Sequence, residues 1–152
     1  MSSVRRTAVV DLAPDEAYAL WTDVRRWSTF VDGFARTERL DEAWPEQGAK
    51  LVWSSPPAGR GTVTEKVVAA ERPRRFATQV IEERLTGTQT AEFAPGEDDG
   101  TTRVALELDY KLQKRGPIAA LTDMIFIRRA QSDALYRTLR RFATEAAEQA
   151  AL

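Results

Sequence analysis

The spacing of apolar residues changes near residues 116–117, and each side of this change predicts a different element. Residues 102–112 alternate between apolar and polar positions, which predicts an antiparallel strand with one solvent-exposed face. From residue 117 onward, apolar residues recur every three or four positions, which predicts a helix over 117–149. The apolar stripe of this helix consists of Ile118, Leu121, Ile125, Leu135, Leu139, Phe142 and Ala146.

The preceding residues predict a strand, two short helices and five more strands. Residues 4–12 are rich in β-branched side chains, as strands are. Pro14 then favours the first turn of a helix over 14–26, because its missing N–H would be unpaired there, and residues 28–33 predict a second, very short helix. Segments closed by turn residues predict strands at 34–42, 49–55, 60–71, 75–84 and 86–94.

This order predicts an α+β fold built on a seven-stranded antiparallel sheet. A sheet that buries only one face needs a cover, and the terminal helix is the only predicted element long enough to supply it. We therefore expect a curved sheet around the long C-terminal helix, with the two short helices closing one edge. No linker or repeat divides the chain, so residues 1–152 predict a single domain, large enough to contain a ligand cavity.

Composition excludes several classes of function. The chain contains no cysteine and no histidine, so cysteine–histidine and serine–histidine catalysis and the commonest metal sites are excluded. We expect no metal and no cofactor. The net charge of −1 does not favour nucleic acid, although residues 111–141 are basic. Neither a signal peptide nor a membrane-spanning stretch is apparent, which predicts a cytoplasmic protein without integral membrane association.

Two polar residues interrupt the apolar stripe of the terminal helix. Burying an unpaired arginine is very costly, so Arg128 must reach solvent, a carboxylate or a ligand. If the stripe covers a concave sheet, Arg128 and Ser132 face the space between helix and sheet. Arg128 would then hold an anionic or enolate group of a ligand, or pair with Glu65 or Glu82. Ser132 would donate to a ligand or bond its own helix backbone.

Further candidates lie on the predicted strands. Tyr110 ends the inward row of the last strand and either contacts a ligand through its hydroxyl or packs in the core. The strand at 60–71 alternates poorly, but apolarity favours Val63, Glu65 and Val67 as its inward set. A desolvated Glu65 near Arg128 would be the only plausible acid–base pair. We predict a cavity of about 300–1,000 Å³, with walls that include Trp53, Leu106, Leu108, Tyr110, Ile125 and Arg128.

The remaining tryptophans divide into core and loop positions. Trp21 and Trp27 lie on the apolar face of the first predicted helix, which predicts that they are core residues. Trp44 precedes Pro45 in a loop, where we expect it to be exposed, at the cavity mouth or in a dimer contact. The sequence is compatible with a monomer and with a homodimer.

Three stretches carry a resemblance to a known superfamily. The opening VVDLAPDEAYALWTDVRRWSTFVDG resembles the SRPBCC, or START-like, polyketide cyclase/dehydrase-like proteins, which share the helix-grip fold of the birch pollen allergen. The stretches GTQTAEFAPGEDDGTTRVALELDYKL and GPIAALTDMIFIRRAQSDALYRTLRRFATEAA are similar to actinobacterial members of unassigned function. The resemblance implies a deep cavity that holds lipids, polyketides, quinones or similar molecules. Aromatase/cyclase members carry tryptophans and an arginine on the strand after the first hairpin, and residues 61–70 contain neither.

These observations leave three hypotheses. The first is a protein that binds or transports a hydrophobic small molecule, and it is favoured by the absence of histidine and by the mismatch with the cyclases. The second is a cyclase or dehydratase that uses Glu65, Tyr110 and Arg128 without a metal. The third is an interaction protein that uses the basic terminal helix.

Overall fold

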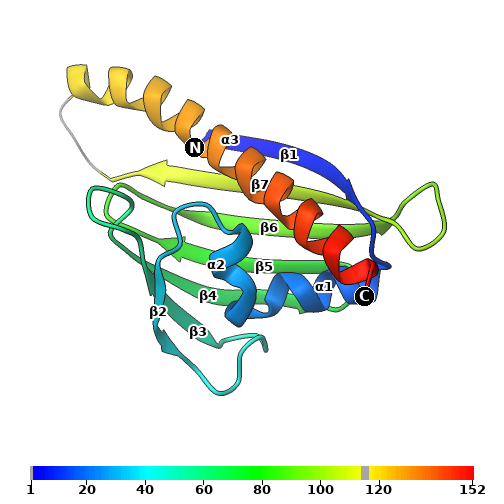
Figure 1. Ribbon diagram of the computed structural model, residues 1–152. Coiled ribbons are helices and arrows are strands. Elements are labelled where there is room, and N and C mark those ends of the chain that lie inside the picture. Colours follow the sequence, from blue (N-terminus) through cyan, green and yellow to red (C-terminus); the bar gives the residue numbers. More distant parts are fainter. Residues whose placement is uncertain (1, 114–116) are drawn as a thin grey trace.

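The computed structural model describes residues 2–113 and 117–152, and the side chains of residues 2–113 and 124–152. Its element order is that of the predicted helix-grip arrangement, which is confirmed (Figure 1). The elements are β1 (Ser2–Val10), α1 (Pro14–Thr22), the 3-10 turn η1 (Val24–Arg26), α2 (Trp27–Phe30), β2 (Arg36–Leu40), β3 (Lys50–Ser54), β4 (Thr62–Glu71), β5 (Arg75–Ile81), β6 (Leu85–Pro95), β7 (Thr102–Leu112) and α3 (Pro117–Ala150).

The first predicted helix is shorter than expected. It ends at Thr22 rather than at residue 26, because Asp23 adopts an extended backbone conformation and its side chain accepts a hydrogen bond from the backbone N–H of Arg25. A polar residue that caps the next turn in this way competes with continuation of the helix. The chain therefore continues as η1 and then as α2.

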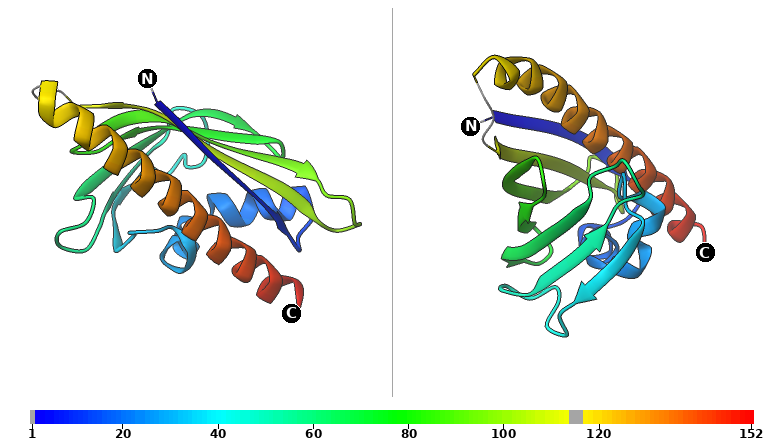
Figure 2. Two further views of the ribbon diagram at one scale, coloured as in Figure 1. Left: turned by 90° about the horizontal axis from the view of Figure 1, so that it is seen from above. Right: turned by 90° about the vertical axis from the view of Figure 1, so that its left-hand side faces the viewer.

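The seven strands form one antiparallel sheet in the order β1-β7-β6-β5-β4-β3-β2. β1 pairs with the last strand, so the two halves of the chain are joined at this side of the sheet. The sheet curves around α1 and α2, and α3 crosses its open side (Figure 2). This arrangement buries one face of the sheet, as the alternation of β7 predicted.

The core lies between the concave face and the three helices. Trp21, Phe30 and Phe142 pack together, with ring centroids 5.1–5.6 Å apart, and so join α1, α2 and α3. Trp21 and Trp27 are buried, as predicted. The prediction for Trp44 was wrong: it is half-buried, and its indole N–H donates to the carbonyl of Thr22.

The two halves of α3 have different surroundings. Its C-terminal half buries Leu135, Leu139, Phe142 and Ala146, the predicted residues. Its N-terminal half follows the edge strand β1 (Figure 2), and Ile125 is exposed there. The apolar stripe of α3 therefore does not contact the sheet along its whole length. Ile118 and Leu121 lie outside the described side chains.

The poor alternation of β4 has a structural cause. Val63, Glu65 and Val67 face inward, as apolarity predicted. A register shift against β5 then occurs between Val67 and Ala69. Such a bulge changes which residues face the core. Ala70 accordingly packs against the core.

Candidate ligand-binding site

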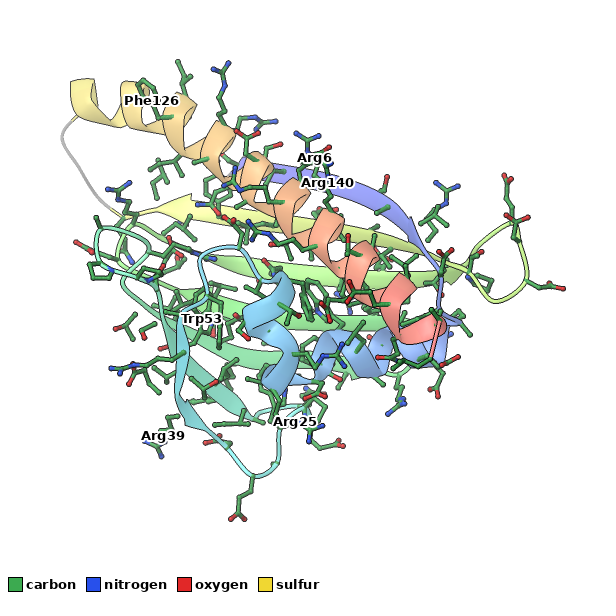
Figure 3. The ribbon with its side chains drawn as sticks, in the orientation of Figure 1. Arg6, Arg25, Arg39, Trp53, Phe126 and Arg140 are labelled. Atoms are coloured by element: carbon green, nitrogen blue, oxygen red, sulfur yellow. The ribbon has the colours of Figure 1, made fainter. Side chains whose placement is uncertain are left out.

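A narrow internal cleft lies between the concave face of the sheet and α3. Trp53 of β3, Glu65 of β4 and Leu106 of β7 line its sheet side, and Gln131 and Leu135 line its helix side. Trp53 lies on the side of the sheet that faces α2 (Figure 3). The enclosed free volume is about 20 Å³, which is sufficient for one water molecule.

A wider mouth adjoins the cleft. This mouth has a volume of about 250 Å³ and lies between residues 58–60, residues 82–84 and the α3 segment from Ile127 to Arg137. Asp32, Arg60, Gln131 and Ala134 line both spaces. The two spaces are therefore adjacent, and we call them together the path to Glu65.

Glu65 is the polar end of this path. Its carboxyl group is buried, with 4% of the residue exposed. Its Oε2 accepts a hydrogen bond of 2.7 Å from Trp53 Nε1, and its Oε1 accepts one of 2.8 Å from Thr78 Oγ1. Both donors are neutral, so the carboxyl group is hydrogen-bonded without a salt bridge among the described residues.

Burial raises the pKa of Glu65 above its ordinary value, because the low-dielectric interior disfavours the charged form. The hydrogen bonds from Trp53 and Thr78 and the charge of Arg60 act in the opposite direction, but do not outweigh burial. The neutral acid is therefore favoured over a wider pH range than in a solvated glutamate. Perturbed carboxyl groups beside clefts are characteristic of functional sites.

Arg60 and Glu82 form an ion pair where the cleft meets the mouth. Arg60 Nε and Nη2 both lie 2.6 Å from Glu82 Oε2. The Arg60 guanidinium also lies 5.1 Å from the centre of the Trp53 ring, a cation–π contact. Only 4% of the Glu82 side chain is exposed, compared with 25% of the Arg60 side chain. Arg60 therefore separates Trp53 from the mouth.

A second charged cluster fixes α3 at the other side of the path. Arg137 and Arg141 both bond the Asp32 carboxylate, and the Asp32 N–H donates to Thr138 Oγ1. Burial alone would raise the pKa of Asp32, but the bonds and charges of the two arginines outweigh it and lower the pKa below its ordinary value. This cluster joins the segment after α2 to α3.

The predicted orientation of Arg128 and Ser132 was wrong. Arg128 is exposed, and both residues line an open groove between α3 and β1, together with Ile125. Ser132 Oγ accepts a hydrogen bond from Arg6 Nε. The reason is helical phase: the described α3 residues that line the cleft or the mouth are Ile127, Ala130, Gln131, Ala134, Leu135, Arg137 and Thr138. The cation that acts on Glu65 is consequently Arg60.

The inward row of β7 is buried as predicted, but only part of it lines the path. Leu106 lines the cleft, whereas Leu108 and Tyr110 are packed in the core and line neither space. The Tyr110 hydroxyl is buried and has no hydrogen-bond partner within the part of the chain that the structure describes. Among the cavities formed by the described side chains, none is lined jointly by Leu106, Tyr110 and Arg128.

Sequence reasoning missed Arg60, Gln89 and Gln131. Arg60 belongs to a loop, where side-chain direction has no periodic signal. Gln89 lies opposite Leu108 in the sheet and so faces inward. A polar residue in the inward row of a strand is the signal that could have identified it.

Among the described residues, no cluster of three or more acidic side chains could hold a metal ion. None of the described helices has the length and hydropathy needed to cross a bilayer.

Residues 1–147 match the profile of the family described as polyketide cyclase / dehydrase and lipid transport. The chain belongs to this family. A search of curated proteins gave no match.

Solved structures of low identity share the fold. A START superfamily protein from Mycobacterium smegmatis superposes with a TM-score of 0.77 at 10% identity, over 97% of this chain and 98% of the other. A protein from Thermus thermophilus gives a TM-score of 0.72 at 18% identity, over 97% and 99%. Norcoclaurine synthase from Thalictrum flavum, in complex with dopamine and hydroxybenzaldehyde, gives 0.71 at 12% identity, over 97% and 87%.

Proposed function

We propose that this chain is one ligand-binding domain for a hydrophobic small molecule that carries a carbonyl or similar hydrogen-bond acceptor. The observation that carries the proposal is the buried Glu65 carboxyl group at the inner end of a path that opens to solvent. Small-molecule sites combine mostly apolar walls with a few placed polar groups. Trp53 and Leu106 supply such walls here.

The hydrogen bonds of Glu65 define the polar group that it offers. Trp53 Nε1 is a donor only, so Oε2 remains an acceptor, and the proton of the neutral acid belongs on Oε1. Without a ligand that proton is directed at Thr78 Oγ1, and an acceptor oxygen of a bound ligand would take the place of Thr78. An anionic ligand group is disfavoured beside Glu65, because burying its charge is costly and Arg60 is already paired with Glu82.

Ligand uptake requires the cleft to widen. The volume beside Glu65 is about 20 Å³, whereas the mouth holds about 250 Å³. Arg60 lies between the two and is the partly exposed member of its ion pair. Movement of its side chain toward solvent would join the two spaces and uncover Trp53.

Blocking the path tests the proposal. Ala134 lines both cleft and mouth, so Ala134→Trp places an indole in the path. Ala147→Trp is the matched control, because Ala147 is exposed near the C-terminal end of the same helix. The probe is Nile red, a neutral carbonyl-bearing dye whose fluorescence rises in apolar sites.

We expect saturable Nile red binding by the wild type and by Ala147→Trp, and at least about tenfold weaker binding by Ala134→Trp, the effect of losing about 1.4 kcal/mol. Thermal melts of the three proteins check that each is folded. Equal binding by Ala134→Trp and Ala147→Trp would contradict the proposal, because the dye would then bind elsewhere. Native mass spectrometry of the purified protein would identify any ligand retained from the cell.

A second candidate function is a cyclase or dehydratase that uses Glu65 as a general acid. The raised pKa of the buried carboxyl group favours it, since a neutral carboxylic acid can protonate a carbonyl or a leaving hydroxyl. Glu65→Gln separates the two functions. A carrier would keep most of its affinity for the ligand, whereas an enzyme would lose turnover while still binding its substrate.

A further inference from the structure

A second surface lies outside the path to Glu65, between the edge strand β1 and the N-terminal half of α3. It is an open groove of about 720 Å³. Arg5 and Arg6 enter it from β1, and Arg128 and Arg129 enter it from α3. Among the described side chains that line it, two are acidic, Glu107 and Asp133, so the arginines outnumber the acids there. We call this surface the β1–α3 groove.

One arginine of the β1–α3 groove is held in place by neutral partners. Arg6 Nε donates to Ser132 Oγ at 3.1 Å, and the guanidinium carbon lies 5.3 Å from the centre of the Tyr136 ring. Neither contact neutralises the charge of Arg6. Arg5 differs, because it lies 3.4 Å from Glu107. The positive charge of Arg6 therefore remains available to an anionic partner.

Exposed apolar side chains adjoin the groove. Met124, Ile125 and Phe126 are 46%, 64% and 68% exposed. Successive helical residues point about 100° apart, so these three side chains extend around much of the helix. Figure 3 shows Phe126 on the part of α3 that lies beyond the sheet. Large apolar side chains grouped in this way mark an interaction surface.

We propose that the β1–α3 groove and the exposed residues 124–126 dock on a bilayer surface that contains anionic phospholipids. The arginines complement the phosphate groups, and the apolar side chains enter the boundary between headgroups and acyl chains. A soluble anion would use the charges but leave the apolar residues exposed. A second copy of the chain packed by two-fold symmetry would bring the same patch, and hence arginines, against arginines.

The docking surface is separate from the internal cleft, so each proposal can fail alone. None of Arg5, Arg6, Arg128 or Phe126 lines the cleft or its mouth. The docking orientation does, however, bring the N-terminal half of α3 to the bilayer. Ile127 and Ala130 of that half line the mouth, so a docked molecule would hold the mouth near the lipid surface.

The experiment is co-sedimentation with two kinds of vesicle, phosphatidylcholine alone and phosphatidylcholine containing phosphatidylglycerol. Arg128→Glu and the double variant Ile125→Ser/Phe126→Ser test the charged and apolar parts of the surface. Arg39→Glu is the charge control, because Arg39 is exposed on β2, far from α3 (Figure 3). Ile81→Ser is the apolar control, because Ile81 is 44% exposed on β5.

We expect binding to the anionic vesicles only. An arginine near such a surface contributes about a fivefold change in partitioning, so Arg128→Glu should weaken binding by at least about fivefold, and Arg39→Glu should not. The double serine variant should also weaken binding, with thermal melts equal to the wild type, whereas Ile81→Ser should bind as the wild type does.

Three results would overturn the proposal. The first is absence of binding to anionic vesicles. The second is equal loss in Arg39→Glu and Arg128→Glu, which would show a general effect of net charge. The third is a concentration-dependent dimer in light scattering that disappears in the double serine variant, which would assign the surface to a second copy of the chain.

Discussion

Replacing Glu65 by glutamine removes one buried titratable group while preserving the size of the side chain. The amide oxygen can still accept the hydrogen bond from Trp53 Nε1, which is 2.7 Å long in the wild type. The amide nitrogen can donate to Thr78 Oγ1 in place of the acid proton. The variant therefore resembles the neutral form of Glu65 at every pH.

The pKa of Glu65 predicts how the difference in stability depends on pH. Burial raises this pKa in the folded state above the ordinary glutamate value of 4.5. Between the unfolded and the folded pKa, the folded protein holds a proton that the unfolded chain has lost, so the wild type loses stability as pH rises. The slope in this window is about 1.4 kcal/mol per pH unit. Above the pKa of Glu65 in the folded state, the difference in unfolding free energy between variant and wild type becomes constant.

Urea unfolding followed by tryptophan fluorescence, in steps between about pH 4 and about pH 8, measures this difference. At the acid end of this range, we expect the free energies of unfolding of Glu65→Gln and wild type to agree within about 1 kcal/mol, the value of one hydrogen bond. As pH rises, the free energy of unfolding of the variant should then increase relative to that of the wild type. Glu83→Gln, the same change at an exposed neighbour of the mouth, is the control for the loss of one carboxyl group outside the core. A variant that instead loses stability with rising pH would refute the reasoning, because it would mean that Arg60 holds Glu65 as a carboxylate.

Two further predictions concern other buried polar groups. Arg60→Met should destabilise the fold by about 3 kcal/mol, because it strands the buried Glu82 carboxylate, and adding Glu82→Gln should recover most of the loss in urea unfolding; a single variant as stable as the wild type would show that Glu82 is solvated. Tyr110→Phe should leave the unfolding free energy unchanged or raise it by up to about 1 kcal/mol, because the hydroxyl has no partner within the described residues. A loss of more than about 1 kcal/mol would show that the hydroxyl is hydrogen-bonded in solution.

The sequence by itself determined the order of the elements, the antiparallel sheet and the burial of its inward rows. These features follow from local periodicity, because a residue's face on a strand or helix depends on its position relative to close neighbours. Alternation placed Leu106 and Tyr110 inside, and apolarity placed Glu65 inside. The buried C-terminal half of α3 followed in the same way from its three-and-four spacing.

Only the tertiary structure decided which buried or half-buried residues meet. The N-terminal half of the 34-residue helix α3 follows β1, and the phase of the helix directs Arg128 into a surface groove instead of toward Glu65. Arg60 reaches Trp53 and Glu82 from a loop, where periodicity carries no information about side-chain direction. The candidate site is thus a set of contacts between residues distant in sequence, and such contacts depend on the angle between helix and sheet, which no local pattern specifies.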